Sequence, residues 1–130
     1  MSPEEYIAQQ PEERREIMLA LHQLVMATDT SVDPIVEPMM GKEMILYKEA
    51  NTMKYGLASV KAHISIHSLP MYSSPELYEK YLELLPKAKF QKGCINFTKP
   101  EAVPLSIIGD FFANCAKISM ADLMAKWKKK

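Results

Sequence analysis

Several features that would assign a sequence to a specialised class are missing from this chain. No apolar run approaches the ~20 residues that a transmembrane helix needs, and the first residues, MSPEEYIAQQ, are acidic and polar, unlike a signal peptide. The two cysteines, Cys94 and Cys115, form no Cys-x-x-Cys pair, which excludes a zinc ribbon and a thioredoxin-like motif. We therefore expect a soluble protein of the cytoplasm with reduced thiols and no membrane segment.

The chain also lacks an excess of charge of one sign. Its 16 basic and 16 acidic side chains cancel and its lysines are scattered, so the basic stripe typical of nucleic-acid-binding proteins is absent. Residues 1–38 carry an excess of acids and residues 39–130 a matching excess of bases. This asymmetry fits an interaction surface, or the ordinary preference of acids for helix starts and of lysine for strand edges. Residues 126–130 are interpreted as a solvated basic tail, and no nucleic-acid partner is expected.

Periodicity and turn residues predict one α+β domain over residues 1–130. Two helices are expected before Thr28; the first starts at SPEE, which has the pattern of a capping box. Strand patterns follow at Met44–Lys48, Met53–Val60, Ala62–Ser68 and Cys94–Thr98. Further helices are expected from Ser73 or Ser74, from Pro104, and from Ser119, the last burying Leu123, Met124 and Trp127. Because short connections require antiparallel pairing, we expect an antiparallel sheet of about four to five strands with helices packed on one face.

The stretch KAHISIHS, Lys61 to Ser68, holds two histidines four residues apart. Apolar Ala62, Ile64 and Ile66 alternate with His63, Ser65 and His67, and a period of two is typical of a strand. On a strand the two histidines are separated by ~13 Å, too far for both imidazoles to bind one zinc ion. The pattern therefore predicts a strand with its isoleucines under the helices, and no shared metal.

The polar side of this strand is the candidate site. In CINFT, Cys94 and Asn96 alternate with Ile95 and Phe97, so they are expected on the same sheet face as the histidines. We call the sheet face opposite the helices the open face. Its candidate ligand-binding residues are Lys61, His63, Ser65, His67, Cys94 and Asn96. This face is interpreted as a groove for a small ligand, as an interface with a protein partner or a second copy, or as an ordinary solvated surface.

Evidence for an enzyme is weaker. A thiolate nucleophile at Cys94 with His63 as its base would need the two side chains within hydrogen-bonding reach. No P-loop, dinucleotide fingerprint, serine elbow or metalloprotease helix occurs in the sequence. A binding or interaction protein, monomeric or homodimeric and without a resident cofactor, is therefore the main hypothesis.

The same residues carry a family resemblance. KAHISIHSLP, then a helix, then FQKGCINFTKPEAVPLSII is similar to the YdhG-like family of small bacterial proteins. The matching positions are Lys61, His63, Ile64, Lys92, Gly93, Ile95, Phe97 and Pro104. The resemblance covers nearly the whole chain. It implies a compact α/β sandwich in a mostly uncharacterised family.

The resemblance also implies a second hypothesis, because some relatives are described as frataxin-like iron-handling proteins. Surface carboxylates suit iron, since hard cations prefer oxygen ligands. Glu12, Glu13 and Glu16 are the candidate iron ligands, at spacings that bring side chains together on a helix. The alternative is that these acids only stabilise the helix start through its dipole, by ~0.3–1 kcal/mol. The alternative function is therefore an iron chaperone that delivers iron through these carboxylates.

Overall fold

A computed structural model of the protein describes residues 1–39, 41–91 and 93–128. Its helices are α1 (Pro3–Ala8), α2 (Glu12–Thr28), α3 (Leu69–Ser73), α4 (Pro75–Leu84), α5 (Leu105–Ala116) and α6 (Met120–Lys128), with a short 3-10 helix η1 (Pro100–Ala102). Its strands are β1 (Asp33–Met39), β2 (Lys42–Glu49), β3 (Thr52–Ser59), β4 (Ile64–Ser68), β5 (Lys89–Gln91) and β6 (Cys94–Phe97). The predicted α+β class is confirmed.

Helix starts follow the capping residues in the sequence. The hydroxyl of Ser2 accepts a hydrogen bond from the Glu5 N–H at 3.1 Å, and the Glu5 carboxylate accepts one from the Ser2 N–H at 2.9 Å. This reciprocal pair satisfies two N–H groups that the first helical turn leaves free. At the start of α4, Ser74 is the cap, and its hydroxyl accepts from the Leu77 N–H at 3.3 Å.

The strands form one antiparallel sheet in the order β1-β2-β3-β4-β6-β5. Ala50 and Asn51 join β2 to β3 with φ angles of 52° and 64°. Two successive residues with positive φ make the turn whose twist suits a tight hairpin. The β3–β4 connection is closed by the Val60 N–H, which donates to the His63 carbonyl at 3.0 Å.

In the part of the chain that the structure describes, the sheet has six strands, more than the four to five predicted. Strand β1 was missed because it contains Pro34 and Pro38, which cannot donate to a sheet ladder. As an edge strand, β1 has every second N–H pointing away from the sheet, so prolines four residues apart are tolerated. The other missed strand, β5, has only three residues, with Phe90 as its one apolar side chain.

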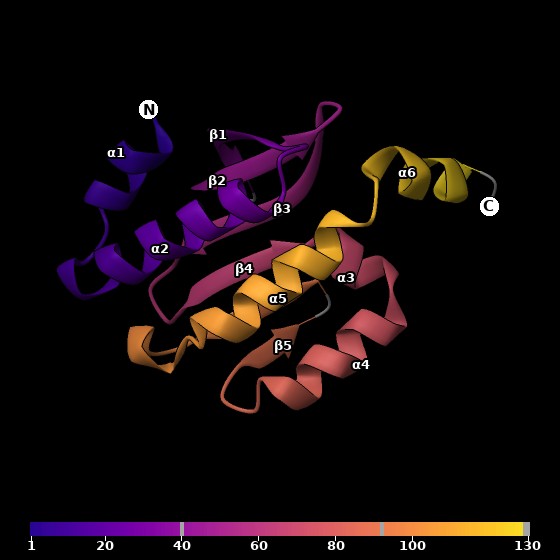
Figure 1. Cartoon of the computed structure of the whole chain (residues 1–130). Coiled ribbons are helices and arrows are strands. Elements are labelled where there is room, and N and C mark those ends of the chain that lie inside the picture. The colour runs from indigo at the N-terminus through magenta and orange to yellow at the C-terminus, as the bar shows by residue number, and fades with distance from the viewer. Residues whose placement is uncertain (40, 92, 129–130) are drawn as a thin grey trace.

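Helices cover one face of the sheet, as predicted. Figure 1 shows α2 and α5 running side by side across this face, with α4 continuing the layer beside α5. The rings of Tyr81 on α4 and Phe111 on α5 pack edge to face at 4.9 Å. Beneath them Ile64 and Ile66 of β4 are each 1% exposed, which confirms a strand with its isoleucines facing the helices. The strand begins at Ile64, later than the predicted Ala62, and Ala62 is exposed in the connection before it. Truncating such a side chain to alanine typically costs about 2–5 kcal/mol.

The open face is less exposed than an ordinary solvated sheet face. Met44, Leu46 and Ala58 are buried there, with Met39 and Met53 packed against them. The polar side chains of this face are also covered, since Ser65 is 5% and Asn96 4% exposed. The interpretation of this face as merely solvated is therefore wrong for its central part.

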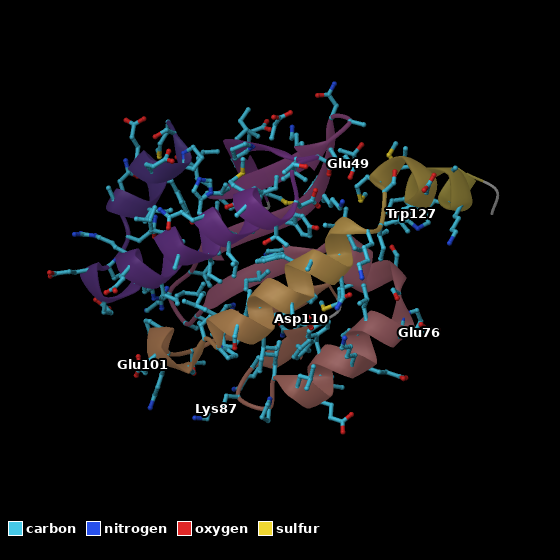
Figure 2. All side chains as sticks on the ribbon, viewed as in Figure 1. Glu49, Glu76, Lys87, Glu101, Asp110 and Trp127 are labelled. Atoms are coloured by element: carbon cyan, nitrogen blue, oxygen red, sulfur yellow. The ribbon has the colours of Figure 1, made fainter. Side chains whose placement is uncertain are left out.

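Helix α6 differs in part from its prediction. Met120 and Leu123 are buried, but Trp127, expected to be buried, is 41% exposed. The Glu49 carboxylate, which Figure 2 labels beside the start of this helix, accepts from the Met120 N–H at 2.9 Å. Of the predicted tail 126–130, the residues up to Lys128 continue α6, and residues 129–130 lie outside the described residues.

Candidate functional site

Strand register brings most of the predicted open-face residues together. In the antiparallel β4–β6 pair His67 lies opposite Cys94 and Ser65 lies opposite Asn96. Side chains directly opposite each other point to the same face and stand close together. These four residues therefore form one polar group on the open face, at the centre of the sheet.

The other two predicted residues lie beside this group or away from it. His63 immediately precedes β4, and its side chain lines a hollow that His67 and Cys94 also line. Lys61 lies in the β3–β4 connection with an exposed side chain, and its carbonyl accepts a hydrogen bond from Arg14 at 3.3 Å. Lys61 lines neither of the two hollows that border Cys94 and His67. Lys92, part of the family resemblance, lies outside the described residues.

A chain of hydrogen-bonding groups runs through this cluster. The Cys94 Sγ lies 3.0 Å from the His67 Nδ1, and the His67 Nε2 lies 3.3 Å from the Ser65 Oγ. The histidine that pairs with Cys94 is therefore His67 and not His63, because the register places His67 directly across from the cysteine. Nitrogen and oxygen are stronger acceptors than sulfur. We therefore assign the thiol as donor to Nδ1 and the Nε2–H as donor to Ser65.

Burial keeps the cysteine and histidine uncharged. It raises the pKa of the Cys94 thiol above its usual 9.0, an effect that a hydrogen bond from Ser65 only partly offsets. It also lowers the pKa of His67 below 6.5, and the neighbouring His63 lowers it further. At neutral pH the pair is thus a thiol and a neutral imidazole, without the thiolate that an activated nucleophile requires.

Two hollows border the Cys94–His67 pair. One, of about 240 Å³, includes Met39, Met44 and His63 in its lining, and the other, of about 320 Å³, includes Met39 and Met53. Both hollows are also lined by Cys94 and His67. The pair is therefore reachable from two sides, and each hollow has two methionines among its lining residues.

Gly56 leaves space on the open face for the side chains of Met44 and Met53. It lies opposite His67 on the neighbouring strand β3. A Cβ added at this glycine would lie 2.5 Å from the Met44 Cε, 2.9 Å from the Met53 Cε and 3.3 Å from the His67 Cβ. Both methionine side chains thus end over Gly56, next to His67, in space that any other residue would fill.

Asn96 has a buried oxygen without a partner. Its Nδ2 donates to the Gln91 Oε1 at 3.2 Å. Among the described residues nothing donates to its Oδ1, although that atom has no exposed surface. Buried polar atoms in folded proteins are usually hydrogen-bonded, and an exception needs an explanation. Asn96 lines neither of the hollows that border Cys94 and His67, and its Oδ1 offers no exposed surface to a ligand.

The predicted iron ligands are only partly brought together. Glu12, Glu13 and Glu16 are all exposed on the first turns of α2. Glu13 and Glu16 line a hollow of about 330 Å³ between α2 and η1, together with Glu101, which Figure 2 labels at η1. Glu12 does not line it. Across residues 1–39, 41–91 and 93–128, no three His, Cys, Asp or Glu side chains are arranged to hold one metal ion.

The structure contains a buried ion cluster that the sequence did not predict. Lys54 is 0% exposed, and its Nζ lies 2.8 Å from the Asp29 Oδ2 and 2.8 Å from the Glu49 Oε1. The Tyr55 hydroxyl also donates to Asp29, at 2.7 Å. The register shift between β2 and β3 turns Lys54 toward the helices, and no alternation in the sequence signals it. This cluster joins the end of α2 to β2 and β3, and it has a structural role.

A larger hollow, of about 340 Å³, lies between the end of α4 and the start of α5. Its lining is mainly apolar, with Leu85, Val103 and Ile107 among its residues and Lys87 and Glu101 as its charged members. None of the groups with a perturbed pKa lines it. The open face, by contrast, combines hollows with converging polar side chains, which is the usual character of a ligand site. We therefore take the open face as the candidate site.

No protein-family model, curated protein or solved structure matches this chain. The resemblance to YdhG-like proteins accordingly remains a prediction from the sequence. In the described part of the chain no helix combines the length and apolar character needed to cross a membrane.

Proposed function

We propose that this chain is a binding protein that receives a ligand on the open face of its sheet, at Cys94 and His67. The observation that carries the proposal is the hydrogen-bonded Cys94–His67–Ser65 chain between two hollows.

Binding fits these groups better than catalysis by a cysteine nucleophile. Such a nucleophile needs a depressed pKa, yet burial raises the pKa of Cys94. Stabilising a developing oxyanion also needs free donors beside the reacting atom. Cys94 and His67 lie within paired strands, whose backbone N–H groups are engaged in the sheet ladder. We therefore favour a binding protein over an enzyme.

Fragment mapping by NMR tests the proposal. A mixture of small amides, alcohols and aromatic fragments is titrated into ¹⁵N-labelled protein, and amide shift changes are mapped onto the fold. The expected changes cluster on β3, β4 and β6, around Gly56, His67 and Cys94. Changes that cluster instead around Val103 and Ile107, in the hollow between α4 and α5, would overturn the proposal. An absence of any localised change would also overturn it.

A second candidate function, an iron chaperone, is favoured by one observation. We propose that Glu13 and Glu16 of α2, which line the same hollow, hold Fe(II) weakly through carboxylate oxygens. Glu12, the third ligand expected from the sequence, does not line this hollow. The hollow is open to solvent and its carboxylates are exposed, which suits an ion that must be passed on.

Anaerobic Fe(II) titration tests this second candidate. The Glu13→Gln/Glu16→Gln variant is compared with wild type and with Glu76→Gln/Glu79→Gln, an exposed pair at the same spacing on α4. We expect the first variant to lose binding and the second to keep it. Equal Fe(II) binding by all three proteins would refute the iron-chaperone proposal without affecting the open-face proposal.

A further inference from the structure

The open face gathers soft donor atoms. Cys94 Sγ and His67 Nδ1 lie 3.0 Å apart in hydrogen-bond contact, and they would need to separate by only ~0.5 Å to bind one metal ion at bond lengths of ~2.3 and ~2.0 Å. The terminal methyls of Met44 and Met53 converge over Gly56, directly opposite His67, and each thioether sulfur is one bond from its methyl. Met39 lines both hollows beside the pair. One thiol, one imidazole and several thioethers therefore surround a single region.

The protonation state of His67 leaves its Nδ1 lone pair free to bind a metal ion. With the Nε2–H directed at Ser65, the lone pair of His67 Nδ1 points to the Cys94 thiol. A partner on the second nitrogen fixes the ring orientation of a metal-binding histidine. A metal ion entering here would displace only the thiol proton, which passes to solvent while the sulfur keeps its electron pair, so no redox step is needed.

The composition of this donor set selects among metals. Thiolate and thioether sulfur favour Cu(I), whereas zinc sites use cysteine, histidine and carboxylate ligands. Within the described ranges no third Cys, His, Asp or Glu is placed to complete such a set. A metal at this position must therefore accept thioether sulfur and few ligands. The iron ligands considered above are oxygen atoms at a different place on the fold.

We propose that the open face binds one Cu(I) ion through Cys94 Sγ, His67 Nδ1 and thioether sulfur from Met44 or Met53. This inference rests on the proposed function, since it names the ligand class of the same site. Met44 is almost fully buried and Cys94 is half-buried, so the bound ion would be shielded from water and from oxidation. The hollows on either side of the pair provide its entry path.

Competition with a Cu(I) chelator tests the inference. Wild-type protein is titrated anaerobically into the coloured Cu(I)–bicinchoninate complex in the presence of ascorbate, and loss of absorbance reports transfer to the protein. We expect one Cu(I) per chain. The Cys94→Ser variant should lose this binding, and Cys115→Ala should retain it because Cys115 lies in the core.

The methionines separate a built site from simple capture by a thiol. Met44→Leu/Met53→Leu conserves side-chain volume, and we expect it to weaken Cu(I) binding at least ~tenfold, as lost metal-site contacts typically do. Thermal unfolding checks that this variant is folded. If it binds Cu(I) as tightly as wild type, Cys94 captures the ion alone and the inference is wrong.

The outcomes also distinguish this inference from the proposed function. If wild-type protein takes no Cu(I) from bicinchoninate while fragments still map to the open face, the copper inference is wrong and the binding function stands. If fragments map to the hollow between α4 and α5 and no Cu(I) is taken up, both are wrong. X-ray absorption of the loaded protein should show sulfur and nitrogen neighbours, and an all-oxygen shell would overturn the inference.

Discussion

Replacement of Gly56 by alanine is the sharpest test of the open-face packing. The added Cβ would lie 2.5 Å from the Met44 Cε and 2.9 Å from the Met53 Cε. Ordinary carbon–carbon contacts are about 3.5–4.0 Å, so the Met44 methyl must retreat by about 1 Å. The two methyls are ends of flexible side chains, and they would move into the hollows beside His67.

The expected magnitude follows from two opposing effects. Overpacking a well-filled region typically costs about 1–3 kcal/mol. Removing a glycine from the unfolded chain recovers about 0.4–1 kcal/mol. We therefore expect Gly56→Ala to lower the free energy of unfolding by about 1 kcal/mol. In urea, where a small domain loses about 1–3 kcal/mol per molar, the midpoint should fall by roughly 0.5 M.

Gly109 supplies a matched control with the opposite expected sign. It lies inside α5, and a Cβ there would be 3.4 Å from the nearest Leu24 atom, an ordinary contact. A glycine inside a helix costs roughly 0.5–1 kcal/mol relative to alanine, so Gly109→Ala should stabilise the protein by about that amount. If both variants prove more stable than wild type, Met44 and Met53 do not converge over Gly56 and the described site is wrong.

Two other predictions concern buried groups. Replacing Lys54 by methionine leaves the Asp29 carboxylate buried without its cation, and should cost about 3–5 kcal/mol at pH 7. Burial alone would raise the pKa of Asp29, but hydrogen bonds led by that from Lys54 hold it below 3.8 in the wild type. This stabilisation of the wild type is present above pH 3.8 and is lost as the pH falls through the folded pKa. In the variant, protonation of the Asp29 carboxyl removes the buried unpaired charge and so removes its cost. Urea unfolding should therefore show the stability gap narrowing from pH 7 to pH 4, and a constant gap would contradict the buried pair. Iodoacetamide should label Cys94 in the folded protein at a rate that still rises with pH above 9.0, because burial raises the pKa of this thiol. Cys115 lies in the core, so it should be labelled only after unfolding. A Cys94 labelling rate that levels off below pH 8 would contradict the neutral thiol.

The sequence predicted those parts of the fold that local patterns determine. Alternation in Ala62–Ser68 predicted the strand that the structure has at Ile64–Ser68, and it also predicted the strand's buried side. Ser2 and Ser74 marked helix starts through their hydroxyls. Strand β1 was not predicted, because prolines such as Pro34 and Pro38 usually exclude a strand. They are tolerated here only because β1 lies at the edge of the sheet.

The composition of the candidate site depends on how the strands pair, and local sequence patterns do not determine that pairing. Alternation placed His63, His67 and Cys94 on one face, but the β4–β6 register decides which histidine meets the cysteine. Met44 and Met53 were read only as strand residues, since their convergence over Gly56 depends on three neighbouring strands. A lone glycine inside a predicted strand is a signal of close approach by another group, and it was the one available clue.

Nitrogen-15 NMR of the His67 ring at pH 7 tests the central claim most directly. The claim is that Cys94 and His67 face each other on the open face as a neutral pair, with the thiol donating to Nδ1. The account predicts a neutral imidazole protonated at Nε2, whose Nδ1 signal changes in the Cys94→Ser variant. An imidazolium ring, a proton on Nδ1, or a ring unaffected by the substitution would contradict it.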